Sequence, residues 1–456
     1  MGSFCVCSGS TLLRLLAMLA LAFCEARTAA AQVPGADQIQ SLQLANGMQI
    51  ILWPDHDIPN VALYNWVRVG SRNEAPGITG LAHFFEHMMF NGTSTQAPGE
   101  FDRKLEAHGA RNNAFTTADV TVYQDWLPST ALELVFQLEA DRLRNLAFDP
   151  KVVESERGVV YSERRLSVDD SQFGRLKEYV QATAFLAHPY RLPTIGWPSD
   201  IEAWQLDDLK HFFATYYAPN NCTLVLVGDI EPANVIELAR KYFEPIAAQD
   251  APPPVRTREP RQRGERRVAL EGKGQTPLLQ FAFHSMAAAD ARLPVLDLLI
   301  RILTDGDASR LHRALVEESR LAIAVDGYFD EGFDPGLAWF VLTLPAHSDI
   351  ARVETAFDRE IQRIRAEGVT DAELAKARSQ ALGDFWRGLA TINGKAEALG
   401  TYAVLRGDYR KLLSAPSDYD AVTATAVRKL AGQLLAPSNR TVGMLSAATT
   451  DTEVEK

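Results

Sequence analysis

The sequence has little cysteine. It contains four cysteines in 456 residues, and Cys5, Cys7 and Cys24 fall in an N-terminal segment that we expect to be removed. Cys222 alone then remains, which excludes an internal disulfide and a zinc site built from thiolates. Because Cys222 begins the apolar run CTLVLVG, we expect it to be a buried structural thiol and not a reactive nucleophile.

Long hydrophobic runs are also missing. Beyond the N-terminal segment no stretch reaches the roughly 18 uncharged apolar residues of a membrane-spanning helix. At the N-terminus, Arg14 precedes the apolar run LLAMLALAF (15–23), and TAAAQ (28–32) offers small residues for cleavage. This layout is typical of a secretory signal peptide. We therefore predict that residues 1–31 are removed and that the mature protein is periplasmic or secreted.

Positive charge is in the minority. The 46 Lys and Arg residues face 58 Asp and Glu residues, which gives a formal net charge of −12. An acidic chain without basic clusters argues against nucleic acid or an anionic membrane as a partner. The one basic stretch, VRTREPRQRGERR (255–267), is rich in proline and arginine and is typical of a linker.

Strand and helix patterns divide the chain into two parts with the same rhythm. LQLANGMQIIL (42–52) predicts a β-hairpin with a two-residue type I′ turn at Asn46-Gly47. Helical periodicity follows at 79–90, and further strands and helices lead to the strand-like run at 222–229. A similar order of strands and helices begins again after the linker. The sequence therefore predicts an α+β protein with an N-terminal domain at 38–246, a linker at 247–267 and a C-terminal domain at 268–448.

The segment LAHFFEHMMFNGT (81–93) holds the strongest chemical signal. His83 and His87 are four residues apart, so in a helix they share one face and can bind one metal ion. Glu86 lies next to that face, where it can take a proton from a water molecule. The order H-x-x-E-H is the inverzincin signature. The alternative is a core helix with two hydrogen-bonded histidines, although the chain has only nine histidines.

A third metal ligand is expected from another element. The helix pattern PKVVESERGVVYSERRL (150–166) offers Glu154, Glu156 and Glu163. Glu156 and Glu163 are two turns apart on one face, about 10 Å along the axis, so we do not expect both to touch one ion. One of them should ligate while the other orients a histidine. The spacing leaves open which does which, and an exposed acidic helix is the alternative.

At this point the chain resembles the pitrilysin/insulinase superfamily of zinc peptidases. Its branch of short subunits, which includes mitochondrial processing peptidase and bacterial relatives, fits the length of 456 residues. Besides HFFEH, the blocks that match the family pattern are NNAFTTADVTVY (112–123), ERGVVYSE (156–163), HPYRLPTIG (188–196), YYAPNNCTLVLVGD (216–229) and DASRLHRALVEE (307–318). The resemblance thus runs through most of the predicted mature chain.

The resemblance implies a fold and a site. The fold would be two homologous α/β-roll halves, each an antiparallel sheet with helices packed on it, which together form half of a clam-shaped peptidase. One Zn²⁺ per chain would be bound by His83, His87 and Glu163, with Glu86 as the general base and Glu156 as a supporting acidic residue. The resemblance also implies an edge strand at 113–116, where a peptide substrate would add as an extra strand against Asn113, Ala114 and Phe115.

One departure from the family pattern bears on the partner. Active single-chain relatives carry an Arg and, seven residues later, a Tyr in the second half. In this sequence Val316 and Ile323 stand at those two positions. Arg313 or Arg320 is a nearby substitute. We therefore expect a heterodimer whose partner subunit supplies the Arg/Tyr pair, with a homodimer that manages without the pair as the alternative.

These patterns predict a zinc-dependent endopeptidase that cleaves short or unfolded peptides. A non-catalytic peptide-binding or scaffold member of the same family is one alternative, although a scaffold has no need of Glu86. A hydrolase of another substrate class with the same metal geometry is a second alternative, and only the NAFT strand speaks against it. The sequence does not give the cleavage specificity.

Overall fold

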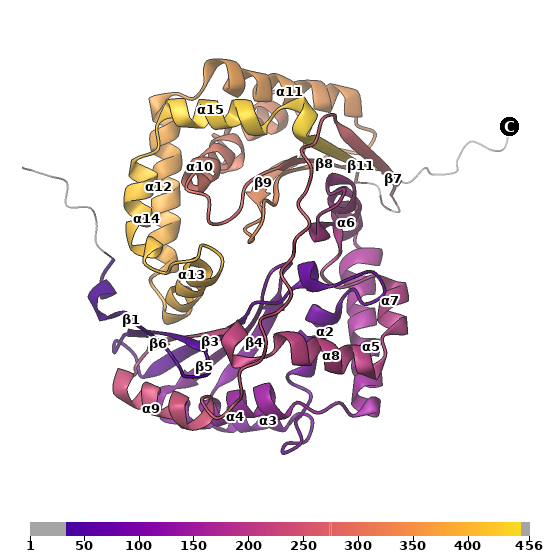
Figure 1. Ribbon diagram of the computed structural model, residues 1–456. Helices are drawn as coiled ribbons and strands as arrows, with labels where there is room; N and C mark the ends of the chain where they lie inside the picture. Colours follow the sequence, from indigo (N-terminus) through magenta and orange to yellow (C-terminus); the bar gives the residue numbers. More distant parts are fainter. Residues whose placement is uncertain (1–32, 273, 275, 448–456) are drawn as a thin grey trace, which may run out of the picture.

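The computed structural model describes residues 33–447 except 273 and 275. The predicted signal peptide at 1–31, with its three cysteines, lies outside the described residues. The chain forms two halves, each a sheet with helices packed on it (Figure 1), so the predicted α+β fold is confirmed. None of the helices in the described part of the chain is both long and apolar enough to cross a membrane.

The N-terminal sheet has six strands in the order β1-β2-β6-β3-β5-β4. Most neighbours are antiparallel, as the resemblance implies, but β2 and β6 run parallel. The run at 222–228 is buried throughout and mostly apolar because β6 lies inside the sheet and is covered on both faces. The strands are β1 (Gln40–Gln43), β2 (Gln49–Pro54), β3 (Asn60–Val67), β4 (Arg111–Thr116), β5 (Thr121–Pro128) and β6 (Cys222–Gly228).

The predicted hairpin at 42–52 exists, but its turn is longer than expected. β1 and β2 pair antiparallel, with Gln43 opposite Gln49 as the last pair. Five residues therefore connect the strands, where the type I′ turn would have used two. The side chain of Asn46 donates hydrogen bonds to the backbone oxygens of Phe243 and Ile246, so a tertiary contact fixes the loop.

Helices cover one face of the N-terminal sheet and enclose the largest apolar core of this half. The helix α5 begins at Pro150, where Asp149 accepts a hydrogen bond from the Lys151 N–H as an N-cap. The helices of this half are α2 (Leu81–Met88), α3 (Glu100–Ala107), α4 (Leu132–Asn145), α5 (Pro150–Arg164), α6 (Gln172–Ala184), α7 (Pro198–Ala203), α8 (Leu206–Tyr216) and α9 (Pro232–Tyr242).

The C-terminal sheet has five strands in the order β7-β11-β8-β10-β9, with β7 and β11 parallel. Its strands are β7 (Arg266–Glu271), β8 (Leu278–His284), β9 (Ala324–Phe329), β10 (Leu337–Thr343) and β11 (Arg440–Ser446). Its helices are α10 (Leu293–Thr304), α11 (Ile350–Glu367), α12 (Asp371–Gly388), α13 (Ile392–Val404), α14 (Lys411–Asp420) and α15 (Ala424–Leu434). A π-helical segment, His312–Glu318, lies between α10 and β9.

One helix of each half packs on the sheet of the other half. α6 of the N-terminal half packs on β7, β8 and β11, and α13 of the C-terminal half packs on β3 and β6. A glycine permits each close approach, because a Cβ on Gly400 would lie 2.1 Å from the Trp66 ring and a Cβ on Gly443 would lie 2.1 Å from Val180. The two halves are therefore interlocked.

The predicted linker runs along the surface of both halves. No helix or strand lies between Tyr242 and Arg266 in the described chain. The segment is nevertheless anchored, since the carboxylate of Glu259 accepts hydrogen bonds from the backbone N–H groups of 186–188 at 2.8–3.0 Å. The segment between the two halves is therefore held in place by hydrogen bonds.

Candidate metal centre

The helix α2 carries the histidine motif, and its N-terminus is fixed by Glu74. The carboxyl group of Glu74 is buried and accepts hydrogen bonds from the backbone N–H groups of Gly80 and Ala82, each at 2.7 Å. These are donors that the first turn of a helix leaves without an intrahelical partner. Burial raises the pKa of Glu74 well above its usual value, and the two donors act in the opposite direction.

One face of α2 is anchored in the aromatic core. Phe84 lies 5.0 Å from the Trp204 ring, and Phe85 stacks on Phe212 with the ring centroids 5.7 Å apart. The hydroxyl of Tyr123 in β5 donates to the backbone oxygen of Phe85. These contacts leave the histidine face of α2 turned toward α5, as the helical period predicts.

His83, His87 and Glu163 converge where α2 faces α5. The Nε2 atom of His83 lies 3.6 Å from Glu163 Oε1, and the Nε2 atom of His87 lies 3.3 Å from Glu163 Oε2. Each of the three side chains offers one ligand atom, and these atoms all lie within 4.8 Å of one another. Among the described residues, no other group of three His, Cys, Asp or Glu side chains is arranged in this way.

Glu156 lies on the other side of His87. Its Oε1 atom is 2.8 Å from His87 Nδ1, and its Oε2 atom accepts a hydrogen bond of 2.8 Å from Asn91 Nδ2. Asn91 also donates to the backbone oxygen of His87. Glu154, the remaining candidate from the sequence, is 74% exposed and pairs with Arg157. The structure therefore brings Glu156 and Glu163 to His87 from opposite sides and leaves Glu154 away from it.

The electrostatics of this cluster favour positive charge between the histidines and the glutamates. Burial opposes a charge on His87, but hydrogen bonds to Glu156 and Glu163 raise its pKa to about 9. Hydrogen bonds from His83 and His87 hold the pKa of Glu163 well below its usual value, and the bond from His87 also lowers the pKa of Glu156. A divalent metal ion would satisfy the same preference.

Glu86 faces the edge strand β4. Its Oε2 atom accepts a hydrogen bond of 2.6 Å from the hydroxyl of Thr116, the last residue of β4. β4 pairs with β5 on one side, and it ends the sheet order on the other. The carboxylate of Glu86 is therefore tied to the end of a strand whose other edge is open for pairing.

The three residues predicted to contact substrate alternate along β4. Asn113 and Phe115 lie on the sheet face opposite α2, where the Phe115 ring is 6.1 Å from Trp66. Ala114 shares the face of Thr116. The structure thus places 113–115 on an edge strand of the sheet that α2 packs on, with the side chains of Asn113 and Phe115 on the face opposite α2.

The structure places Val316 and Ile323 away from this cluster, in the C-terminal half. Val316 packs against the C-terminal core, and Ile323 is 57% exposed. Of the two nearby arginines, Arg313 is paired with Glu318 at 3.8 Å. Arg320 has a left-handed backbone with φ of 52° and follows the π-helical segment.

Three residues around the site were missed from the sequence. Glu74 gave no signal, because it precedes α2 in an irregular segment and its role depends on the fold. Asn91 stands before Gly92, a pair that is typical of a helix end, and that pattern does not point to Glu156. Thr116 is the last residue of the NAFT segment, but a hydroxyl in a strand has no periodic signature that points to Glu86.

Comparison with known proteins gives the family of this architecture. The model of the insulinase family, peptidase family M16, matches residues 50–197, and the model described as the M16 inactive domain matches residues 203–381. The zinc protease PqqE of Helicobacter pylori is 30% identical over 371 residues, which are 80% of this chain and 82% of that protein. The chain belongs to the insulinase (M16) family of peptidases.

Other M16 relatives and structures agree with this assignment. The zinc protease YmxG of Bacillus subtilis is 24% identical, over 85% of this chain and 94% of its own length. A crystal structure of a protease from H. pylori superposes with a TM-score of 0.86 at 27% identity, covering 90% of this chain and 99% of that one. The M16 relatives named here are zinc proteases, which supports a metalloprotease.

A further comparison shows how this fold is used in a longer chain. The periplasmic protease PqqL of Escherichia coli matches with a TM-score of 0.74 at 20% identity, and the match covers 91% of this chain but 48% of that one. The first half of PqqL, solved alone, matches with a TM-score of 0.75. The fold of this M16 chain therefore corresponds to one half of PqqL.

Proposed function

We propose that the chain is a zinc-dependent endopeptidase in which His83, His87 and Glu163 bind the metal. The observation that carries the proposal is the convergence of their three ligand atoms within 4.8 Å beside the carboxylate of Glu86. Two imidazole nitrogens and one carboxylate oxygen form a donor set typical of catalytic zinc, which keeps a further position open. The relatives named as zinc proteases support the choice of metal.

Glu156 and Asn91 would be positioning residues for this centre. With its Nδ1–H donated to Glu156, His87 would offer the lone pair of Nε2 to an ion bound between it and Glu163. Asn91 holds the second oxygen of Glu156 and the backbone of His87 together. Together they would hold the orientation of the His87 ring.

Glu86 would act as the general base and then as the general acid. Bound zinc would lower the pKa of a water molecule and polarise the scissile carbonyl. The carboxylate of Glu86 would take the proton of the attacking water and return it to the leaving amine. Its hydrogen bond from Thr116 directs one oxygen to β4 and leaves the other free for this proton transfer.

The substrate would be a short or unfolded peptide that adds to β4. The open edge of β4 offers backbone N–H and C=O groups for strand addition, which requires an extended chain. Asn113, Ala114 and Phe115 would line this addition, and the end of β4 at Thr116 would place the scissile bond near Glu86. A folded protein cannot supply such a free strand.

The working enzyme would be a pair of such chains. The apolar residues Val316 and Ile323 stand where active relatives carry the Arg/Tyr pair, so we propose a heterodimer whose partner subunit supplies it. A homodimer is the alternative. The fold correspondence to one half of PqqL supports pairing of two such units. The predicted signal peptide and the periplasmic PqqL support a periplasmic location.

A non-catalytic scaffold remains the second candidate. The match to the M16 inactive domain covers residues 203–381, which lie outside the histidine cluster and Glu86. If the chain is a scaffold, we expect it to bind zinc but to cleave no peptide, alone or with a partner subunit.

The proposal is tested by cleavage of an unstructured, quenched-fluorescence peptide. The purified, zinc-loaded chain is assayed alone and after a homologous subunit with the Arg/Tyr pair is added. We expect slow or no cleavage alone and rapid cleavage by the pair, abolished by a chelator. Rapid chelator-sensitive cleavage by the chain alone would refute the heterodimer, and zinc binding without cleavage in either case would refute the peptidase.

Replacing Thr116 by valine should lower kcat by about tenfold with little change in KM. Valine keeps the shape of threonine but removes the hydrogen bond that directs Glu86. Thr116→Ser retains the hydroxyl and should recover most of the rate, and zinc content should be unchanged in both variants. Equal losses in the valine and serine variants would contradict the prediction, because serine retains the hydroxyl that donates to Glu86.

A further inference from the structure

The two halves have the same topology, so elements can be matched between them. β7-β11-β8-β10-β9 corresponds in order and direction to β2-β6-β3-β5-β4. α10 lies between β8 and β9 in the chain and contacts β9, as α2 lies between β3 and β4 and contacts β4. α11 and α12 follow as α4 and α5 do. The counterpart of the histidine cluster is therefore expected where α10, β9 and α12 meet.

An arginine stands at this counterpart position. Arg301 of α10 makes ion pairs with Asp297 at 2.9 Å, with Asp305 at 3.1 Å and with Asp384 of α12 at 2.6 Å. Asp297 and Arg301 are four residues apart, as are His83 and His87, and Asp384 lies as far along α12 as Glu163 lies along α5. A guanidinium group thus supplies in this half the positive charge that a metal would supply in the other.

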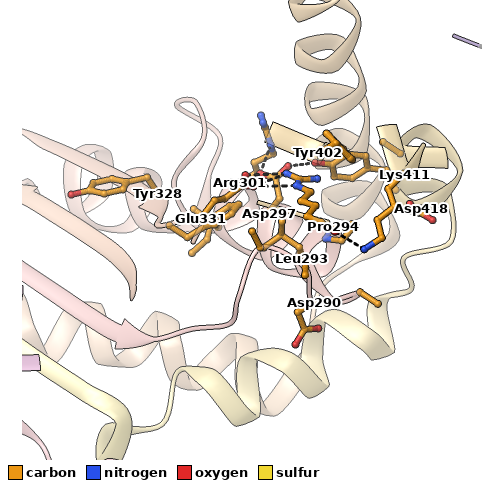
Figure 2. Close-up of a pocket in the computed structure, with 18 of the residues that line it drawn as sticks. Asp290, Leu293, Pro294, Asp297, Arg301, Tyr328, Glu331, Tyr402, Lys411 and Asp418 are labelled. Carbon is orange, nitrogen blue, oxygen red and sulfur yellow. Dashed lines mark hydrogen bonds and ion pairs between the residues drawn. The ribbon is translucent and has the colours of Figure 1, made fainter. Parts of the chain in front are cut away.

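A large cavity opens beside this cluster (Figure 2). Its volume is about 820 Å³, which is within the usual size of small-molecule sites, and α10, β9, α13 and α14 contribute to its walls. All of its lining residues belong to the C-terminal half. The cavity is therefore separate from the candidate metal centre and from β4.

The lining of the cavity has an excess of negative charge. Six carboxylates and three cationic side chains line it. Arg301 is neutralised by the three aspartates, and Arg406 by the carboxylate of Glu331 at 2.8 Å. Among the described residues, Asp326 and Asp418 take part in no ion pair, and both are exposed. Lys411, the third cationic side chain, pairs with no described carboxylate and donates to the backbone oxygen of Arg406 at 2.7 Å. An anion would therefore find one cation that is not held by a carboxylate, whereas a cation finds two carboxylates without a counter-charge.

We propose that this cavity binds an organic cation, through ammonium or guanidinium groups that reach Asp326 and Asp418. Tyr328, Tyr402 and Tyr419 also line the cavity. The rings of Tyr328 and Tyr402 already face Lys177 at 5.4 Å and Arg406 at 4.1 Å, so Tyr419 supplies the aromatic surface for such a group. The cation is either a free polyamine or a basic side chain of a peptide, since both present the same groups. The inference does not rest on the proposed peptidase activity, because no lining residue belongs to the N-terminal half.

The test is isothermal titration calorimetry with the full chain at low ionic strength. Spermidine and a capped arginine tripeptide are the two probes, and the Glu86→Gln background prevents consumption of the peptide. Asp326→Asn combined with Asp418→Asn removes two exposed charges at almost constant shape. We expect the dissociation constant of at least one probe to rise about tenfold or more in the double variant and also to rise with added salt.

The matched control is Asp250→Asn, an exposed aspartate in the linker outside the cavity lining, which should leave both affinities unchanged. Loss of spermidine binding in the double variant identifies a free amine as the ligand, and loss of tripeptide binding identifies a basic side chain. Binding that is insensitive to the double variant, or glutarate binding as tightly as spermidine, overturns the proposal. Thermal unfolding of the double variant shows that it is folded.

Discussion

Replacing Glu86 by glutamine should lower kcat by about 10²–10⁴-fold while zinc stays bound. Glutamine keeps the shape of the side chain and can still meet the hydroxyl of Thr116 at 2.6 Å. It cannot take a proton from water at neutral pH. Because Glu86 is not among the three converging ligands, metal content measured by atomic emission should match that of the wild type.

The control for this variant is Glu154→Gln. Glu154 has the same chemistry but lies exposed on α5, where it pairs with Arg157. It should retain the wild-type rate of peptide cleavage, assayed with whichever partner subunit makes the wild type active. A Glu86→Gln protein that cleaves as fast as the Glu154→Gln protein would remove Glu86 from the proposed mechanism.

Replacing Arg142 by methionine should lower the free energy of unfolding by about 3–5 kcal/mol. Arg142 of α4 is 1% exposed and forms an ion pair with Glu139, which is fully buried. Its guanidinium also lies over the rings of Tyr123, Phe101 and Phe90 at 4.5, 4.7 and 5.1 Å. Methionine fills much of the volume but leaves the Glu139 carboxylate buried without a counter-charge.

The second buried carboxyl in this cluster adds to the effect. Burial and the charge of Glu139 raise the pKa of Asp125 well above its usual value, whereas Arg142 acts to lower it. Urea unfolding of Arg142→Met, followed by tryptophan fluorescence, measures the loss. The exposed Arg144 on the same helix is the matched position, and Arg144→Met should change stability by less than about 0.5 kcal/mol. Similar values for the two variants would show that the buried pair contributes nothing.

Local patterns in the sequence carry most of what positions the candidate site. The spacing of His83 and His87 and the apolar flanks of 84–85 require only that a helix form, so α2 was predictable. The helix at 150–166 was also predictable from the Asp149-Pro150 start. Its rotation about its own axis was not, because that depends on packing against α2. Spacing therefore does not decide which of Glu154, Glu156 and Glu163 is the third metal ligand. The resemblance to a family is needed to choose among them.

Tertiary contacts account for what the sequence did not predict. The Asn46-Gly47 pair favours a tight turn locally, but hydrogen bonds from Asn46 to residues near 243–246 stabilise a longer loop. The parallel pairing of β2 with β6 joins strands more than 150 residues apart, and no local pattern records it. Glu74 likewise acts on α2 only because the fold brings its buried carboxyl to the backbone of Gly80.

The exchange of α6 and α13 between the two halves limits how early the N-terminal half can fold during synthesis. The helix α13 buries the aromatic side chains of Trp53, Tyr64 and Trp66. It begins only at Ile392, near the end of the chain. An N-terminal fragment that stops at the linker would carry the candidate metal ligands but expose a wide aromatic sheet face, which favours aggregation. The nascent chain must therefore be almost complete before its first half can mature.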